Sequence, residues 1–229
     1  MLAALESSLQ AQRQLVADAS HELRTPLTSL RTNIEVLATE RELAPDERRR
    51  LLSDVVDQLG EMTTLIAELI ELARGAQHAA EPEDVRLDLV AATAVERARR
   101  DRPGVAFSLD AEETFVHGVP SSLERAIGNL LDNAAKWSPP GGSVEVHVGD
   151  GEVTVRDHGP GIDEADLPYV FDRFYRAPAA RGLSGSGLGL AIVKQVAETH
   201  GGTVAAEAAE GGGTQMRLRL NGSEAAANS

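Results

Sequence analysis

Three side chains near residue 20 could together perform nucleophilic chemistry on the surface of a helix. His21 and Glu22 are adjacent, and Thr25 follows His21 by four residues, so His21 and Thr25 share one helical face. A neutral imidazole is a good nucleophile near neutral pH. A nearby carboxylate can take the proton from one ring nitrogen while the other attacks an electrophile. The segment predicts a reactive histidine, although a solvated surface histidine would show the same pair.

A proline distinguishes these two interpretations. Pro26 stands one turn after His21, inside a segment with helical periodicity, and should bend the helix there. A proline in a helix interior costs about 3 kcal/mol. That cost favours a functional reason for the segment over an incidental surface histidine.

Two asparagines could hold a metal ion beside phosphate groups. Asn129 and Asn133 are four residues apart in a helical pattern, and therefore lie on one face. Proteins usually bind Mg²⁺ through few ligands of their own, together with waters and phosphates. Two amides can do this without adding negative charge. Helix caps or surface amides would show the same spacing.

A carboxylate at the end of a strand could recognise adenine. Asp157 follows a strand-like run and precedes Gly159 and Gly161. Its carboxylate can accept a hydrogen bond from the exocyclic amino group of adenine, and the glycines allow the backbone to approach the base closely. An ordinary turn would have the same composition.

Two further segments could contact phosphate. Phe171–Arg176 places arginines among aromatic residues, which could anchor a loop and present a cation; a loop packed by its own aromatic rings would look alike. The run Gly185–Leu190 precedes a helical pattern, and free N–H groups at a helix N-terminus favour anions. Its glycine spacing matches neither the P-loop nor the dinucleotide-binding motif.

Long helices are expected to position the histidine. Apolar residues recur at spacings of three and four over residues 23–37 and again over residues 52–69, as in coiled-coil seams. Arg41–Asp46 contains a proline and interrupts the pattern, which predicts a turn. Two long helices alone bury too little apolar surface, so we expect two hairpins to pair into the four-helix bundle of a homodimer.

Residues 82–222 alternate strand-like and helix-like runs. The patterns predict helices over residues 87–100, 121–136 and 187–200. They predict strands over residues 105–109, 114–117, 144–148, 153–156, 203–206 and 214–220, with a hairpin turn at Gly149–Gly151. The expected fold is α+β: a helical hairpin followed by an α/β sandwich, with an antiparallel-rich sheet and its helices on one face.

The composition also predicts the division of the chain. We expect a helical hairpin over residues 1–76, a linker over residues 77–84, a second domain over residues 85–222 and a disordered tail over residues 223–229. The linker assignment rests on the short stretch Gly75–Pro82 (GAQHAAEP).

Charge and cysteine content exclude several classes of protein. The formal net charge is −14, whereas a nucleic-acid-binding protein usually presents a basic face. The chain has no cysteine, which excludes disulfide scaffolds, cysteine nucleophiles and thiolate metal sites. No apolar run reaches the roughly 18 residues that a membrane span needs, and no signal peptide opens the chain.

The first segment resembles a known signalling motif. Asp18–Leu30 (DASHELRTPLTSL) resembles the H-box of sensor histidine kinases, in the large group with a dimerisation and phosphoacceptor hairpin. The resemblance implies that His21 accepts the γ-phosphoryl group of ATP on its outer ring nitrogen, with Glu22 as base partner. It also implies that Thr25 helps water attack the phosphorylated partner protein.

The four later segments, in this order and spacing, resemble the N, G1, F and G2 boxes of the GHKL ATPase domain, the Bergerat ATP-binding fold. Histidine kinases, gyrase-type topoisomerases, Hsp90-type chaperones and mismatch-repair ATPases share this domain, and only the histidine kinases have the H-box. The resemblance covers about residues 10–220. It implies ATP and Mg²⁺ as cofactors, with Asn133 as the metal ligand.

The same resemblance assigns individual roles around the nucleotide. It implies that Asp157 reads adenine, that Trp137 stacks near the base where a tyrosine or phenylalanine is usual, and that the Thr214 hydroxyl supports a water network there. Lys136 and Arg176 would meet phosphate. The implied cofactor-binding residues are Asn129, Asn133, Lys136, Trp137, Asp157, Gly159, Gly161, Arg176, Gly185, Gly187, Leu188, Gly189 and Thr214.

The implied activity is that of a protein-histidine kinase in two-component signalling. The phosphoryl group would move from ATP to His21 and then to an aspartate in a response-regulator receiver domain, after a hinge movement at the linker. Two alternatives stay open: a regulator-binding phosphatase or degenerate scaffold in which nucleotide only tunes conformation, and a GHKL ATPase that does conformational work. The family also implies a cytoplasmic fragment of an inner-membrane sensor, meeting the membrane only through upstream segments.

Overall fold

The computed structural model describes residues 2–39, 44–74, 81–180 and 185–221. The chain divides into two compact units, Met1–Ala73 with Gly182–Ser186 and Arg74–Arg181 with Gly187–Ser229. Residues 77–80 of the predicted linker and the whole predicted tail lie outside the described residues, so the start of the linker and the start of the tail stay predictions. In the described part of the chain, no helix is long and apolar enough to cross a membrane.

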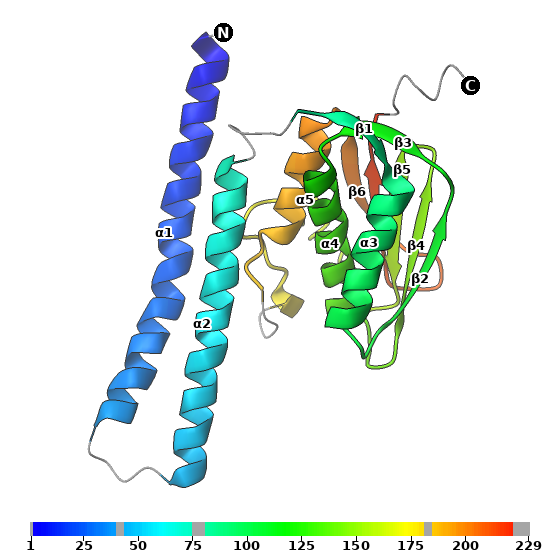
Figure 1. The fold of residues 1–229 in the computed structure, drawn as a ribbon. Coiled ribbons are helices and arrows are strands. Elements are labelled where there is room, and N and C mark those ends of the chain that lie inside the picture. Colours follow the sequence, from blue (N-terminus) through cyan, green and yellow to red (C-terminus); the bar gives the residue numbers. More distant parts are fainter. Residues whose placement is uncertain (1, 40–43, 75–80, 181–184, 222–229) are drawn as a thin grey trace. The chain divides into compact units, whose positions relative to one another are not determined.

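The first unit contains two long helices, α1 (Leu2–Ala38) and α2 (Pro45–Arg74) (Figure 1). Helix α2 begins at a proline, whose missing N–H would have no helical partner at that position. Asp46 and Glu47 occupy its first turn, where negative charge is favourable beside the helix dipole. Helix α2 therefore begins inside the predicted turn Arg41–Asp46, and residues 40–43 lie outside the described residues.

Both helices carry a stripe of large apolar side chains that are exposed in the single chain. The stripe has exposed fractions between 44% and 65% and consists of Val16, Leu27 and Ile34 on α1 and Leu52, Val56, Leu59, Ile66 and Ile70 on α2. A second apolar stripe beside it is less exposed, and includes the buried Leu30, Leu65 and Leu72. The apolar side chains of each helix thus form two rows, one largely exposed and one less exposed.

The second unit is a sheet packed against helices, as predicted. Its helices are α3 (Leu87–Asp101), α4 (Pro120–Trp137) and α5 (Gly189–Thr199), with a short 3-10 turn η1 (Pro178–Ala180). Its strands are β1 (Glu83–Arg86), β2 (Ala106–Ala111), β3 (Phe115–Gly118), β4 (Ser143–Gly149), β5 (Glu152–Asp157), β6 (Thr203–Ala208) and β7 (Thr214–Arg219).

Five strands form the main sheet in the order β2-β4-β5-β7-β6. Strands β2 and β4 are parallel, and the other neighbours are antiparallel. Helices α3, α4 and α5 lie on one face of this sheet (Figure 1), and the alternating valines of β4 and β5 are buried. The α+β fold class is therefore confirmed.

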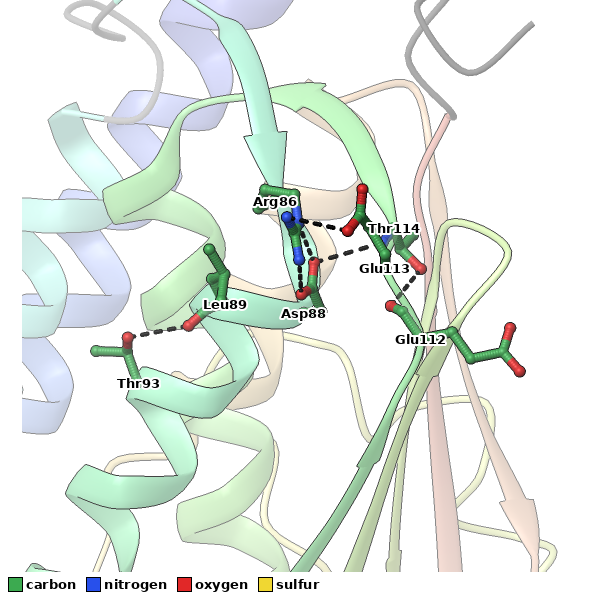
Figure 2. Close-up of polar contacts among 7 residues, drawn as sticks. All are labelled: Arg86, Asp88, Leu89, Thr93, Glu112, Glu113 and Thr114. Atoms are coloured by element: carbon green, nitrogen blue, oxygen red, sulfur yellow. Dashed lines mark hydrogen bonds and ion pairs between the residues drawn. The ribbon is translucent and has the colours of Figure 1, made fainter. Parts of the chain in front are cut away.

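Strand β1 is a correction to the prediction. Residues 83 and 84, assigned to the linker, belong to a strand that pairs antiparallel with β3 in a separate two-stranded sheet. Arg86 at its end forms two hydrogen bonds with Asp88 in the first turn of α3, at 2.9 and 2.7 Å (Figure 2). Asp88 also accepts the Thr114 N–H at 3.4 Å. These bonds lower the pKa of the Asp88 carboxyl despite its burial.

Candidate functional site

His21 lies on an exposed part of α1. The side chains of His21, Glu22 and Thr25 are all exposed. Neighbouring residues in a helix do not face each other, and His21 has no hydrogen bond or ion pair with any residue that the structure describes. The imidazole is therefore accessible to an incoming electrophile, while proton transfer to Glu22 stays a prediction.

Helix α1 continues through Pro26. Because proline has no N–H, the Glu22 carbonyl one turn earlier lacks its helical donor. This acceptor lies in the residue next to His21, at the surface of the helix. The predicted bend at Pro26 stays a prediction.

Asp157 is the best-defined polar group of the second unit. It ends β5, and its side chain is only 2% exposed. Its Oδ1 atom accepts the N–H groups of Gly159 at 2.8 Å and Thr214 at 3.1 Å. Among the described residues, nothing donates to Oδ2. One carboxylate oxygen is thus fixed by the fold, and the other is left as an acceptor for a ligand.

The start of β7 closes tightly on this carboxylate. Gly213 has a φ of +87°, and a Cβ there would lie 2.0 Å from the Asp157 carbonyl oxygen, so only glycine fits. Gly161 lies beside Gly213 on the turn that follows Asp157. The structure therefore brings four predicted site residues, Asp157, Gly159, Gly161 and Thr214, together where β5 ends and β7 begins. It gives the Thr214 hydroxyl no hydrogen bond within the described chain, so the water network stays a prediction.

Helix α4 brings the candidate metal ligands to the start of α5. The Asn129 amide donates to the Gly189 carbonyl at 3.1 Å, which leaves its own carbonyl oxygen as an acceptor. Asn133, one turn later, is half-buried and has no hydrogen bond with any described residue. Lys136 and Trp137 are half-buried on the last turn. Two amide oxygens and an ammonium group in this position suit a phosphate group with its cation.

The segment after Gly161 is held by aromatic residues. The Tyr175 hydroxyl donates to Asp166 at 2.6 Å, and its ring lies 5.7 Å from that of Tyr169. The hydrogen bond to Asp166 raises the pKa of Tyr175 to about 12. The next residue, Arg176, donates to the Ala180 carbonyl at 2.7 Å. The Tyr175 and Arg176 side chains therefore both connect this loop to neighbouring residues.

The glycine-rich run Gly185–Leu190 contacts the aromatic segment Phe171–Arg176 through a backbone hydrogen bond. Phe174 has the left-handed φ of +62° and donates its N–H to the Gly187 carbonyl at 3.0 Å. Gly187 itself has a φ of +77°, so α5 begins at Gly189 and not at Gly187 as predicted. Leu188 is fully buried and precedes the helix. Gly185 also has a positive φ, of 133°.

Two of these contacts could not be found from the sequence. The left-handed Phe174 carries no signal, because aromatic residues rarely adopt that conformation. The Tyr175–Asp166 bond joins residues nine apart in a stretch without periodicity. Both contacts connect the aromatic segment to its surroundings, and only the folded backbone shows them.

Comparisons with known proteins agree with this geometry. A family model described as "His Kinase A (phospho-acceptor) domain" matches residues 11–77. A second model, described as "Histidine kinase-, DNA gyrase B-, and HSP90-like ATPase", matches residues 118–224. The first match contains His21, and the second contains all the residues discussed around Asp157.

Individual relatives point the same way. A protein of Mycobacterium sp. (strain KMS), named signal transduction histidine-protein kinase/phosphatase MprB, is 46% identical over 223 residues, which are 93% of this chain and 43% of that protein. The chain thus spans less than half the length of the curated relatives it matches.

Two solved structures are also similar. The mycobacterial sensor histidine kinase MprB is 42% identical, with a TM-score of 0.56, over 62% of this chain and 97% of that one. The ATP binding domain of PrrB from Mycobacterium tuberculosis is 30% identical, with a TM-score of 0.53, over 63% of this chain and 99% of that one.

Proposed function

The chain belongs to the sensor histidine kinases, and we propose from this premise that it transfers the γ-phosphoryl group of ATP to His21 and then to an aspartate of a response regulator. In the first step a ring nitrogen of His21 forms a bond to the γ-phosphorus, and the bond to the β,γ-bridging oxygen breaks, releasing ADP. In the second step the phosphohistidine nitrogen is the leaving group, and an aspartate oxygen takes the phosphoryl group.

The observation that carries the nucleotide part of this proposal is the buried Asp157. Its Oδ1 is occupied by two backbone N–H groups, and its Oδ2 is left without a donor in the described chain. Among the described residues, the only fully buried side-chain N or O atom without a partner is Arg156 Nε, so Oδ2 of Asp157 is accessible to a ligand. The exocyclic amino group of adenine would supply the missing donor.

The phosphate groups of ATP would lie between α4 and the start of α5. Lys136 and Arg176 would supply positive charge, and the N-terminus of α5, which begins at Gly189, would supply backbone N–H groups. Asn133, whose amide has no partner among the described residues, would hold Mg²⁺ with support from Asn129. When bound, this ion would offset the charge of the phosphate oxygens.

Reversal of the signal is the second activity we propose. The curated relatives are named kinase/phosphatase, and Glu22 and Thr25 are exposed on α1 beside His21. Thr25 would orient water toward the phosphorylated aspartate of a bound receiver domain. Glu22 would assist the proton transfers at His21.

We also propose that two chains pair through the uncovered apolar stripe. Eight large apolar side chains in the stripe are between 44% and 65% exposed, and burying them against a second hairpin would complete a four-helix bundle. A hinge in the part of the predicted linker that precedes β1 would let the nucleotide domain reach His21. Attachment to the inner membrane through segments outside this chain remains a prediction.

The test is incubation of the purified protein with ATP labelled in the γ-phosphoryl group. The proposal expects label that is labile in acid and stable in alkali, and that disappears in His21→Gln. Dephosphorylation of a receiver domain without self-labelling would instead favour the phosphatase or scaffold alternative. Steady ATP hydrolysis without any phosphoprotein would favour an ATPase doing conformational work.

A further inference from the structure

His200 joins two elements of the nucleotide domain at the end opposite to the candidate phosphate site. It follows the last turn of α5, and its ring is half-buried. Its Nε2 atom accepts the Val119 N–H at 3.0 Å, and its Nδ1 lies 2.7 Å from the Val196 carbonyl oxygen. These two contacts require a neutral ring with the proton on Nδ1, because one nitrogen must accept while the other donates.

The Val119 N–H is a buried donor that needs an acceptor. Val119 is 5% exposed and is the N-cap residue of α4, with no capping side chain of its own. A buried backbone N–H without an acceptor costs free energy comparable to a lost hydrogen bond. His200 therefore supplies an acceptor that the start of α4 needs.

The space occupied by the His200 imidazole also depends on a neighbouring glycine. Gly118 precedes Val119, and a Cβ at Gly118 would lie 2.5 Å from the His200 ring. The chain thus has a glycine at the end of β3, where the imidazole lies. Steric contact with Gly118 therefore restrains the ring in addition to its hydrogen bonds.

Helices α4 and α5 are therefore tied at both ends. The Asn129–Gly189 bond joins them at the start of α5, and the Val119–His200 bond joins them at its end. Helix α5 has 11 residues, so its two ties are about 15 Å apart at the usual rise per residue. Without the Val119–His200 bond, α5 would be held to α4 mainly through the Asn129–Gly189 bond, and rotation about that point would turn the N–H groups of its first turn away from their direction in the natural protein.

We infer that His200 is a positioning residue for the nucleotide site. It holds α5 in register with α4, and so fixes the backbone N–H groups at the start of α5 relative to Asn133. This inference rests on the proposed function, because it assigns His200 to the phosphate half of the proposed ATP site. Adenine recognition at Asp157 should not depend on it, because Asp157 is held by Gly159 and Thr214.

The experiment compares two ligands in titration calorimetry with Mg²⁺ present. ADP tests the phosphate half of the site, and adenosine tests the adenine half alone. His200→Leu should weaken ADP binding by about fivefold or more, the low end of typical coupling between sites, and change adenosine binding less than twofold by the same reasoning. His200→Gln, whose side-chain oxygen can accept the Val119 N–H, should recover most of the ADP affinity.

A control and a second variant separate positioning from general destabilisation. Asp88→Asn should lower the unfolding temperature without changing the ratio of ADP to adenosine affinity. Gly118→Ala should displace the ring and weaken ADP binding in the natural protein, but should have little further effect in His200→Ala, where no ring remains.

The outcomes are distinct. Natural protein that binds ADP, with His200→Leu binding it equally well or losing ADP and adenosine in parallel, overturns this inference alone. Natural protein that binds neither ADP nor ATP overturns the proposed function together with it. Selective loss of ADP affinity that His200→Gln restores supports the inference.

Discussion

Replacing Asp157 by asparagine distinguishes the roles of the two carboxylate oxygens. An asparagine can keep its oxygen where Oδ1 accepts the Gly159 and Thr214 N–H groups, at 2.8 and 3.1 Å. Its NH₂ group would then occupy the place of Oδ2, facing the amino group of adenine donor to donor. The variant should therefore fold and lose the contact to the base.

The size of the effect follows from the type of bond. A hydrogen bond to a charged acceptor contributes about 1.5–3 kcal/mol. At 1.36 kcal/mol per factor of ten, affinity for ADP should fall by between about tenfold and about 150-fold.

The assay is ADP titration, followed by calorimetry and by the fluorescence of Trp137. Trp137 is the chain's single tryptophan, and its backbone carbonyl borders the turn at Gly159. Asp88→Asn is a matched control, since Asp88 is also buried and also accepts a threonine N–H. ADP affinity unchanged in Asp157→Asn, or lowered equally in Asp88→Asn, would refute the assignment of adenine recognition to Asp157.

Three further predictions concern stability and assembly. The pKa of Asp88 is lowered by its bonds to Arg86 and Thr114, so its contribution to stability is complete above the ordinary carboxyl pKa and is lost as pH falls through the lowered value; unfolding curves of natural protein and Asp88→Asn should differ at neutral pH and converge in acid, and a constant difference would contradict this. Gly213→Ala should lower the thermal midpoint by several degrees or prevent folding, because the new Cβ would meet the Asp157 carbonyl at 2.0 Å; an unchanged midpoint in calorimetry would be inconsistent with the tight approach. Ile66→Ser in the exposed stripe should shift a dimer toward monomer in gel filtration with light scattering, whereas Val36→Ser, exposed on the opposite face of α1 from Leu27, should not; natural protein that is monomeric throughout would remove the bundle proposal.

The sequence predicted the elements that follow simple periodicity. Heptad spacing located both long helices, and alternation located β4 and β5 with the turn at Asp150–Gly151, where both residues have positive φ. Asp157 was predicted because a carboxylate at a strand end followed by glycines is a local signal. A right-handed helix cannot include a residue with left-handed φ, so α5 begins at Gly189, after the left-handed Gly187.

The parts that escaped prediction depend on long-range contacts. Strand β1 has only four residues, mostly charged, and exists because β3 pairs with it some 30 residues later. The bond from Thr214 to Asp157 uses a backbone N–H, which no side-chain pattern announces, while the role of the Thr214 hydroxyl that the family resemblance implies stays a prediction. Likewise, the Val119–His200 bond spans 81 residues and leaves no pattern in the sequence.

The central claim is that the exposed imidazole of His21 accepts the phosphoryl group of ATP. Tandem mass spectrometry of the ATP-treated protein, digested under alkaline conditions that preserve phosphohistidine, tests this directly. The account predicts that phosphate is found on His21. Phosphate on the neighbouring Ser20 or Thr25 hydroxyl instead, or none on any peptide while ATP is bound, would contradict it.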